Sequence, residues 1–420
     1  MTARFDVVVA GAGPAGSVAA LVLARAGVRV ALVDKAAFPR DKACGDLVGP
    51  RGVRVLADLG VAVPDAGQGR DLLAVGPSGR RVRLPAYAGR TYADHGIVVP
   101  RVAFDDALRR AALDAGAVGL QGRVSEAESE PGGPARALLT SDGQRLAADV
   151  FIGADGALSP VARLTGLLRP DRALWGFAIR AYLPAQVPLP LLVLLDAEPW
   201  RIYPGYGWLF PGADGQANVG IGVGMGSSRR AAPLRADLAR FCQQLRDAGD
   251  LTPDARPGPV TGGWLRMGGR GTPLAAGNVL LAGDAAGLIN PLQGEGIAPA
   301  MLSGRLAAQA VLAGPGQAAR AYTETATAAF GRYLPGAAAL QSALLRRRRV
   351  TSAATRLLTA PVVGRLVAGT WSVYWNGLAD GAQPHPAAWA AAAVQRLTSL
   401  GPATARWDTA QQTGHSMIQI

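Results

Sequence analysis

Residues 34–52 of the chain, DKAAFPRDKACGDLVGPRG, bring several chemically useful side chains into one short stretch. They include Cys44, one of only two cysteines, and Lys35 and Lys42, the two lysines of the chain. A cysteine can exchange protons, line a pocket or pack as a small apolar residue, because the reactivity of a thiol depends on its surroundings. The stretch follows a glycine-rich segment, so its role depends on what that segment binds.

The segments around this stretch predict a dinucleotide-binding βαβ unit. FDVVVA (5–10) and VRVALVD (28–34) predict buried strands, and SVAALVLARAG (17–27) predicts the helix between them. Asp34 ends the second strand, where a carboxylate can bind a ribose 2′-hydroxyl and disfavours the 2′-phosphate of NADP. The loop before the helix has the pattern G-x-G-x-x-G, which lets a pyrophosphate approach the helix N-terminus. Its residues are Gly11, Ala12, Gly13, Pro14, Ala15 and Gly16.

Two later segments each carry an acid at the carboxyl end of a predicted strand. The acid is Asp155 in residues 148–166 and Asp284 in residues 277–311. Ligands gather at this edge of open α/β sheets, and Asp284 can hydrogen-bond a polyol. A nicotinamide enzyme does not need this third element, so the order of the three segments predicts FAD. Around these acids we expect the cofactor to contact Gly156, Gly283, Pro291, Gly294, Glu295, Gly296 and Ile297.

The composition indicates a compact, loop-rich protein with a large core. The chain has 420 residues, of which 49% are hydrophobic and 17% charged. Its net charge of +13 comes almost entirely from arginine, but no zinc-finger spacing or RNP-type motif accompanies it, so we do not expect nucleic acid binding. Cys44 and Cys242 form no disulfide framework and no metal pattern, which predicts a reduced, cytoplasmic setting without a metal. No apolar run is long enough to span a membrane, and the N-terminus predicts a strand instead of a signal peptide.

The segment YGWLFPGADGQANVGIG (206–222) contains residues that suit an apolar cavity. Alternate residues of a strand share one face, so its three aromatic residues are expected to form an aromatic wall. The next predicted strand has glycine at alternate positions, which leaves room for a ligand. We expect a long hydrophobic slot between the wall and the glycine face; the alternative is that the aromatic residues are ordinary core. The predicted substrate-binding residues are Tyr206, Trp208, Phe210, Pro211, Gly220 and Gly222.

The acid- and glycine-containing segments, in this order, resemble the aromatic-hydroxylase-type superfamily of FAD enzymes. The resemblance implies an α/β fold with a Rossmann-like FAD-binding domain, an inserted β-sheet-rich substrate domain and a helical C-terminal region. The segment VPRVAFDDALRRAALDAGA (99–117) is similar to the superfamily helix whose leading arginine, here Arg101, contacts the flavin. The implied domains are FAD-binding at 1–70, 96–166 and 275–335, substrate-binding at 71–95 and 167–274, helical at 336–400, and a tail at 401–420.

Three segments narrow the resemblance to the geranylgeranyl reductase family. They are KACGDLVGPRGV, YGWLFPGADGQANVGIG and GDAAGLINPLQGEGI. This resemblance implies that the turn after the second strand arrives beside the flavin ring, with basic residues near the phosphate or adenine. The further cofactor-binding residues expected on this basis are Lys35, Arg40, Ala43, Cys44, Gly45 and Val124.

The family resemblance implies an FAD-dependent oxidoreductase that reduces carbon–carbon double bonds of a lipophilic isoprenoid or polyene by hydride transfer from reduced flavin. Cys44, Tyr206 and Glu295 are candidate catalytic residues that could give the completing proton, and the sequence does not rank them. A single dinucleotide fingerprint leaves NAD(P)H, or another reduced carrier, to dock transiently as the electron donor. The same scaffold could instead serve a monooxygenase that hydroxylates or epoxidises a secondary metabolite. Halogenation is disfavoured, because halogenases of this superfamily use a downstream lysine and none follows Lys42.

Residues 336–378 combine apolar helical stretches with a basic cluster, Arg346 to Arg349. Pro361 is expected to break the second of these helices. A basic run beside apolar helices can lie on an anionic membrane surface, which would suit a lipid substrate and a peripheral membrane association. The alternative is an ordinary helical cap over the substrate cavity.

Overall fold

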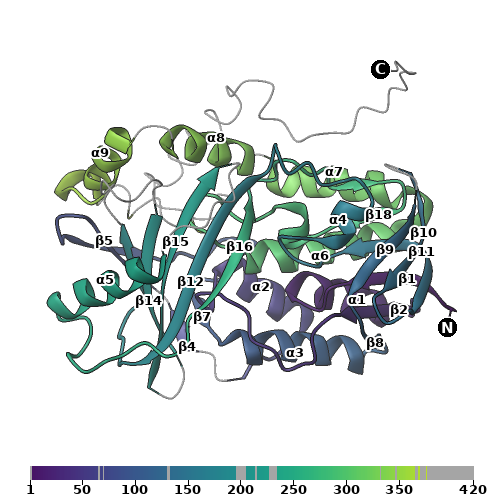
Figure 1. Ribbon diagram of the computed structural model, residues 1–420, viewed down its shortest axis with the longest axis horizontal. Coiled ribbons are helices and arrows are strands. Elements are labelled where there is room, and N and C mark those ends of the chain that lie inside the picture. Colours follow the sequence, from purple (N-terminus) through teal and green to yellow (C-terminus); the bar gives the residue numbers. More distant parts are fainter. Residues whose placement is uncertain are drawn as a thin grey trace.

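The computed structural model describes residues 2–64, 67–69, 71–129, 133–194, 205–212, 215–226, 234–331, 333–345, 348–364, 368 and 375. Within this part of the chain two large β-sheets lie next to each other, and helices pack around the sheet that contains the N-terminus (Figure 1). The architecture is the α/β fold predicted from the sequence.

The sheet that contains the N-terminus has eight described strands and is parallel at its centre. The strands are β1 (Thr2–Ala10), β2 (Val30–Asp34), β8 (Val118–Gln121), β9 (Val124–Ser129), β10 (Ala135–Thr140), β11 (Arg145–Gly153), β17 (Ala275–Ala276) and β18 (Val279–Leu281). Their central order is β17–β18–β11–β1–β2–β8, and β10 and β9 extend the sheet from β11. Residues 7–10 and 150–153 are buried and apolar, as expected for parallel strands that are covered on both faces.

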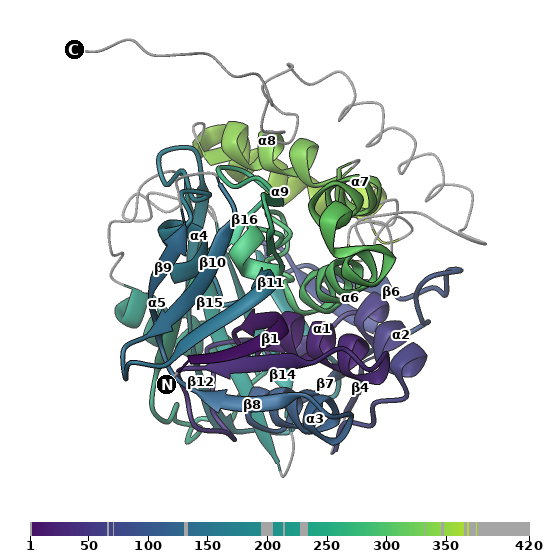
Figure 2. The same cartoon turned by 90° about the vertical axis from the view of Figure 1, so that its right-hand side faces the viewer.

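Helix α1 (Pro14–Arg25) packs against α6 (Ile297–Ala313) and α3 (Arg101–Asp114), and Figure 2 shows α1 beside β1. Helices α1 and α6 approach very closely at Gly304, where a Cβ atom would lie 2.0 Å from the carbonyl oxygen of Ala15. The remaining helical elements of this half are α2 (Pro50–Leu59), α4 (Pro160–Leu164), η1 (Gly283–Ala286), η2 (Pro315–Gln317) and α7 (Ala318–Phe330).

The second large sheet has seven described strands and is mostly antiparallel. They are β5 (Asp71–Val75), β6 (Arg81–Pro85), β12 (Leu174–Pro184), β13 (Leu191–Leu194), β14 (Gly205–Pro211), β15 (Gln216–Gly226) and β16 (Thr261–Met267), in the order β16–β12–β15–β14–β13–β5–β6. Helix α5 (Leu234–Asp247) covers one face, and its Phe241 ring fills the space beside Gly207, where a Cβ would lie 2.4 Å from it. Side chains that alternate with Gly207, such as Trp208, therefore point to the opposite face.

A small sheet and two C-terminal helices complete the described fold. The small sheet consists of β3 (Leu47–Val48), β7 (Gly96–Val98) and β4 (Gly67–Gly69), paired in that order. Helices α8 (Leu334–Leu345) and α9 (Arg348–Leu358) follow, and α9 ends before Pro361 as predicted. Among the described residues no helix is both long and apolar enough to cross a membrane. The predicted tail at 401–420 and most of the predicted helical region after residue 364 lie outside the described residues, as do Arg346, Arg347 and the side chain of Arg348.

Candidate functional site

The G-x-G-x-x-G loop forms a cradle that only glycine permits. Gly11 has a φ of +101°, and a Cβ on it would lie 2.3 Å from the carbonyl oxygen of Ala154. A Cβ on Gly16 would lie 1.8 Å from the carbonyl oxygen of Gly11. Gly13 caps α1 without a side chain, and Pro14 occupies the first turn. The N-terminus of α1 is therefore open to an anionic group.

Charged side chains border this cradle. The Asp34 carboxylate accepts hydrogen bonds from the backbone N–H groups of Ala12 at 2.7 Å and Ala36 at 2.8 Å. The Nη2 of Arg40 lies 3.6 Å from the place that a Cβ on Gly13 would take, and its buried Nη1 has no hydrogen-bond partner among the described residues. A phosphate oxygen beside Gly13 would supply that partner, so these residues fit a dinucleotide.

Three other residues were predicted to contact the cofactor. Lys35 is exposed, and Val124 begins β9 and packs into the core. Ala43 faces β16, where its Cβ lies 3.6 Å from the place of a Cβ on Gly263. Their contacts with a cofactor stay predictions.

Arg101 begins α3 and is almost completely buried. Its Nε and Nη2 donate to the two carboxylate oxygens of Asp105, both at 2.7 Å, and Arg40 reaches the same carboxylate at 2.9 Å. Burial lowers the pKa of Arg101, but Asp105 and Cys44 outweigh this effect and raise it above its ordinary value. A permanently charged guanidinium therefore lies next to the Cys44 thiol.

The two acids that follow the later strands have different partners. Asp155 accepts hydrogen bonds from the Ser159 hydroxyl at 2.5 Å and the Val161 backbone N–H at 2.8 Å, and burial raises its pKa. Asp284 forms an ion pair with the Nζ of Lys42 at 3.1 Å. Asp155 therefore organises the start of α4, whereas Asp284 connects η1 to the cysteine-containing stretch.

A buried arginine behind Asp284 was missed by the sequence analysis. Arg266 lies on β16, is fully buried, and donates from Nε to the carbonyl oxygen of Asp284 at 3.1 Å. Its two terminal nitrogens have no hydrogen-bond partner in the described part of the chain. Burial lowers its pKa to about 10, against the attraction of Asp155 and Asp284. In a chain so rich in arginine, no sequence signal distinguishes this one.

The turn formed by Cys44 and Gly45 meets the predicted aromatic wall. A Cβ on Gly45 would lie 2.9 Å from the Phe210 ring and 3.3 Å from the Nε1 of Trp208. The ring centroids of Trp208 and Phe210 are 6.3 Å apart, so both rings line the same face. Two segments that are far apart in the sequence therefore form one site.

The loop before α6 enters the same site. The Tyr206 hydroxyl donates to the carbonyl oxygen of Gln293, and a Cβ on Gly294 would lie 2.7 Å from the Tyr206 oxygen. Cys44 and Glu295 both interact electrostatically with the Tyr206 hydroxyl. The structure thus brings the three candidate proton donors into one region.

The slot predicted between the aromatic wall and the glycine face is wrong in its geometry. Strands β14 and β15 are direct neighbours, and Trp208 is paired with Gly220. The indole lies over that glycine, because a Cβ there would be only 2.1 Å from the ring. At Gly222 the nearest Trp208 ring atom is at an ordinary 3.7 Å. The aromatic wall and the glycines therefore lie on the same face of the sheet. The Trp208 indole fills the space beside Gly220 that the predicted slot would need.

The three candidate donors differ in their pKa values. Burial raises the pKa of the Cys44 thiol, although the Arg101 charge opposes this effect. Burial also raises the pKa of Tyr206. Burial raises the pKa of Glu295 to about 7, against a hydrogen bond from the Ala298 backbone N–H. Glu295 is therefore the group whose proton is most readily exchanged near neutral pH.

A buried polar network behind the wall was also missed. Asp46 adopts a left-handed φ of +63°, and its carboxylate accepts hydrogen bonds from the Tyr182 hydroxyl at 2.5 Å and the Asn218 Nδ2 at 2.8 Å. Asn218 also donates to the carbonyl oxygen of Cys44 at 2.8 Å and accepts from the Trp208 Nε1 at 2.9 Å. The network fixes both the turn and the indole. Only Asp46, which directly follows Cys44-Gly45, could have been found from the sequence.

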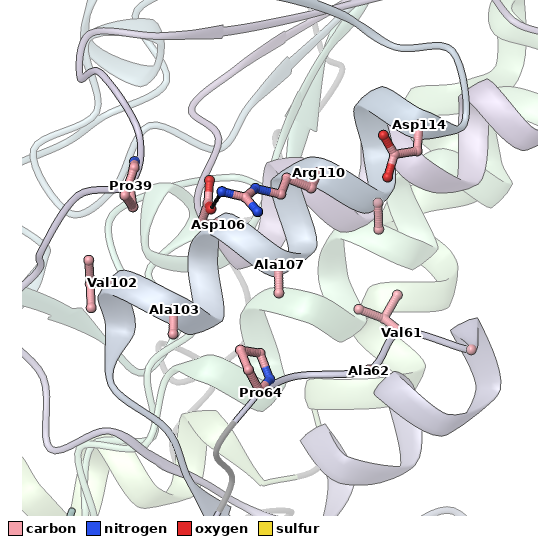
Figure 3. A pocket seen from close by; sticks show the side chains of 12 residues that line it. Pro39, Val61, Ala62, Pro64, Val102, Ala103, Asp106, Ala107, Arg110 and Asp114 are labelled. Atoms are coloured by element: carbon pink, nitrogen blue, oxygen red, sulfur yellow. Dashed lines mark ion pairs between the residues drawn. The ribbon is translucent and has the colours of Figure 1, made fainter. Parts of the chain in front are cut away.

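A surface groove of about 550 Å³ lies between the end of α2 and α3 (Figure 3). Arg110 and Asp106 form an ion pair at 2.7 Å within it. No predicted cofactor or substrate residue lines the groove, so it is separate from the candidate site. It is lined by Pro39, Gly60, Val61, Ala62, Pro64, Val102, Ala103, Asp106, Ala107, Arg110, Ala111 and Asp114.

Comparison with known proteins agrees with this geometry. Residues 4–178 match the FAD binding domain family. The menaquinone reductase of Mycolicibacterium smegmatis is 37% identical over 329 residues, which cover 75% of this chain and 78% of the relative. Digeranylgeranylglycerophospholipid reductase 1 of Methanopyrus kandleri is 32% identical over 331 residues, which cover 73% and 80%.

Solved structures share the fold. A geranylgeranyl bacteriochlorophyll reductase-like protein from Thermoplasma acidophilum superposes with a TM-score of 0.70 at 24% identity, covering 86% of this chain and 92% of that one. A flavin-dependent brominase and a probable FAD-dependent monooxygenase from Pseudomonas aeruginosa share the fold at still lower identity. At these identities the structures support the architecture alone.

The matched FAD binding domain and the relatives, together with the glycine-rich cradle and the strand-end acids, identify an FAD-dependent oxidoreductase. This confirms the predicted enzyme class and cofactor. The chain belongs to the geranylgeranyl reductase family of FAD-dependent oxidoreductases, as its sequence motifs indicated.

Proposed function

We propose that the protein reduces carbon–carbon double bonds in the isoprenoid chain of a lipophilic molecule such as a quinone. The observation that carries this proposal is the meeting of Cys44, Tyr206 and Glu295 beside an aromatic wall. A carboxyl group that titrates near neutral pH next to a large apolar surface suits proton delivery to a bound polyene. The names of the two relatives, a menaquinone reductase and a digeranylgeranylglycerophospholipid reductase, support it.

The side chains of the site divide the work in this proposal. When bound, FAD supplies the hydride that the alkene accepts. The aromatic wall packs along the chain, excludes water and holds one double bond in place, which lowers the entropic cost of the reaction. Glu295 gives a proton to the second carbon of that double bond. The residues that would hold FAD are Gly11, Gly13, Gly16, Asp34, Arg40, Arg101, Gly283 and Asp284.

We propose that NAD(P)H or another reduced carrier docks transiently to supply electrons. The sequence has one G-x-G-x-x-G pattern, and FAD would occupy it. No second pattern of this kind is left for NAD(P)H, which supports transient docking. The domain boundaries given above, at residues 70, 96, 166 and 275, also stay a proposal.

The alternative is a monooxygenase on the same scaffold, and oxygen dependence separates the two. We expect dithionite-reduced enzyme to saturate a menaquinone side chain under strictly anaerobic conditions, because hydride transfer needs no oxygen. Mass spectrometry should show a gain of hydrogen pairs in the side chain of the product, apart from the two hydrogens that the quinone ring takes up when it is reduced. A heat-unfolded sample with the same free FAD is the control. Unchanged menaquinone without oxygen, with an oxygenated product in air, would establish the monooxygenase instead.

We also propose that the C-terminal helices touch a lipid surface. Several large apolar side chains are exposed there, including Leu357 at 56% and Val362 at 73%. Arg349 and Arg356 are exposed among them, which suits an anionic lipid headgroup. The exposed apolar set of this region is Leu340, Val350, Leu357, Leu358 and Val362.

Co-sedimentation with phosphatidylglycerol vesicles tests this surface. We expect the Leu357→Asp, Val362→Asp double variant to bind at least about tenfold more weakly than wild type, because two apolar side chains no longer enter the interface. Leu312→Asp is the matched control, since Leu312 is an exposed leucine at the end of α6. Equal binding of the double variant and the control would remove this surface from consideration.

A further inference from the structure

A tryptophan from the C-terminal region lies inside the candidate site. Trp375 is 3% exposed and belongs to a buried apolar cluster with Trp208 and Phe210 of the aromatic wall. Tyr206 packs against the edge of the same cluster. The aromatic wall of β14 therefore continues onto a residue that comes much later in the chain.

Two glycines make room for the Trp375 indole. A Cβ on Gly49 would lie 2.9 Å from the indole Nε1 and 3.4 Å from the Oε1 of Glu295. Gly49 has a φ of −68° and a ψ of 167°, which any residue can adopt, so its backbone does not require glycine. A Cβ on Gly96 would lie 3.0 Å from the indole ring. The missing side chains give the indole its place, and Glu295 borders the same spot.

We propose that Trp375 closes one end of the aromatic wall and determines which double bond of the isoprenoid chain is reduced. This inference rests on the proposed function and names a residue that sets its specificity. The indole is large and rigid, and it is enclosed by Gly49, Gly96 and the aromatic wall, so a chain that lies along the wall must stop at it. Since isoprene units repeat along the chain, the position of the indole at the end of the wall selects the unit that reaches Glu295.

A purely structural tryptophan would behave differently. Trp175 is 1% exposed, but it belongs to the core cluster beneath α5 and makes an edge-to-face contact with Trp264. That cluster contains none of the candidate donors. Removing the Trp175 indole should lower the free energy of unfolding without altering the product. Trp175→Leu is therefore the matched control for the effect of removing the Trp375 indole.

The test uses the full-length holoenzyme, reduced with dithionite under anaerobic conditions. The substrates are menaquinones whose side chains differ by one isoprene unit, and mass spectrometry locates the saturated unit. For Trp375→Ala we expect saturation to move to a different unit. We also expect the ratio of kcat/KM between two such menaquinones to change at least about tenfold, the scale of discrimination by an apolar pocket. Trp375→Phe should shift the ratio in the same direction by less.

Gly49→Ala provides an independent arm. The three atoms nearest to the added methyl are side-chain atoms of Trp375 and Glu295, so Gly49→Ala should slow turnover in the wild-type background and do so less in Trp375→Ala. Flavin content and thermal unfolding are measured for each variant, and Trp375→Phe carries the test if Trp375→Ala does not fold. A wild-type enzyme that saturates no menaquinone contradicts the proposed function. If the wild-type enzyme saturates menaquinone, and the Trp375 variants saturate the same isoprene unit with the same ratio of kcat/KM values, only the proposed role of Trp375 is contradicted.

Discussion

In the Glu295→Gln variant we expect turnover by the reduced enzyme to fall by about 10²–10⁴-fold, the usual contribution of a positioned general acid. Glutamine keeps the shape of the side chain and can still accept the backbone N–H of Ala298, which Glu295 Oε1 accepts at 3.0 Å. What it lacks is the transferable proton. Flavin content and thermal unfolding should therefore stay close to those of the wild type, while saturation of the menaquinone side chain slows.

The pH dependence gives a second signature of the same residue. Burial raises the pKa of Glu295 to about 7, so its carboxyl holds a proton below that pH and loses it above. We therefore expect wild-type turnover to fall as pH rises through about 7, and this limb should be missing in Glu295→Gln. The raised pKa also means that the folded state binds the proton more tightly than the unfolded chain. Its contribution to stability is present at low pH and is lost as pH rises through the folded pKa.

Three further variants separate the candidates. Cys44→Ala removes the thiol and Tyr206→Phe removes the hydroxyl of the other two candidate donors. Burial raises the pKa values of both groups. Each should keep more of its turnover than Glu295→Gln. Glu324→Gln is the matched control, because Glu324 is exposed on α7 and pairs with Arg320 at 2.8 Å. If Tyr206→Phe or Cys44→Ala abolished turnover while Glu295→Gln retained both activity and the pH limb, the proton donor would be reassigned.

The sequence predicted those parts of the site whose residues lie close together in the chain. The cradle at Gly11 and Gly16 is formed by residues a few positions apart, so its pattern can be recognised in the sequence alone. Alternation likewise predicted the shared face of Tyr206, Trp208 and Phe210, because it needs only the period of a strand.

The parts that the sequence could not predict depend on register and long-range contact. The predicted slot is wrong because it depends on the strand register, and the sequence of this segment does not reveal that Trp208 pairs with Gly220. The hydrogen bonds from Asn218 to the Cys44 turn, and the entry of Trp375 beside Gly49, join positions that only the tertiary fold brings together. Charge alone does not distinguish a buried arginine such as Arg266 from the exposed ones.

Asp105→Asn should be the most destabilising conservative change near the cofactor cradle. The Asp105 side chain is completely buried, and its carboxylate neutralises both Arg101, through two bonds of 2.7 Å, and Arg40 at 2.9 Å. Asparagine would remove the carboxylate that both guanidinium groups share, so the buried Arg101 would lose the negative charge that stabilises its charged form most. Breaking a buried ion pair on one side costs about 3–5 kcal/mol, so we expect a large drop in the urea midpoint. FAD should also be retained less well, because Arg40 borders the cradle.

The neighbouring aspartate provides the control. Asp106 pairs at 2.7 Å with Arg110, whose side chain is 69% exposed, so Asp106→Asn should cost no more than about 1 kcal/mol. A second readout separates charge from general damage. Without Asp105, a negative charge next to Arg101 is removed, so the Arg101 charge is less compensated and favours the thiolate form of Cys44 more strongly. In folded Asp105→Asn, iodoacetamide should therefore alkylate Cys44 faster than in the wild type. Equal urea midpoints for the two aspartate variants, or an unchanged alkylation rate, would show that the Arg101–Asp105–Arg40 cluster is not the electrostatic support of this site.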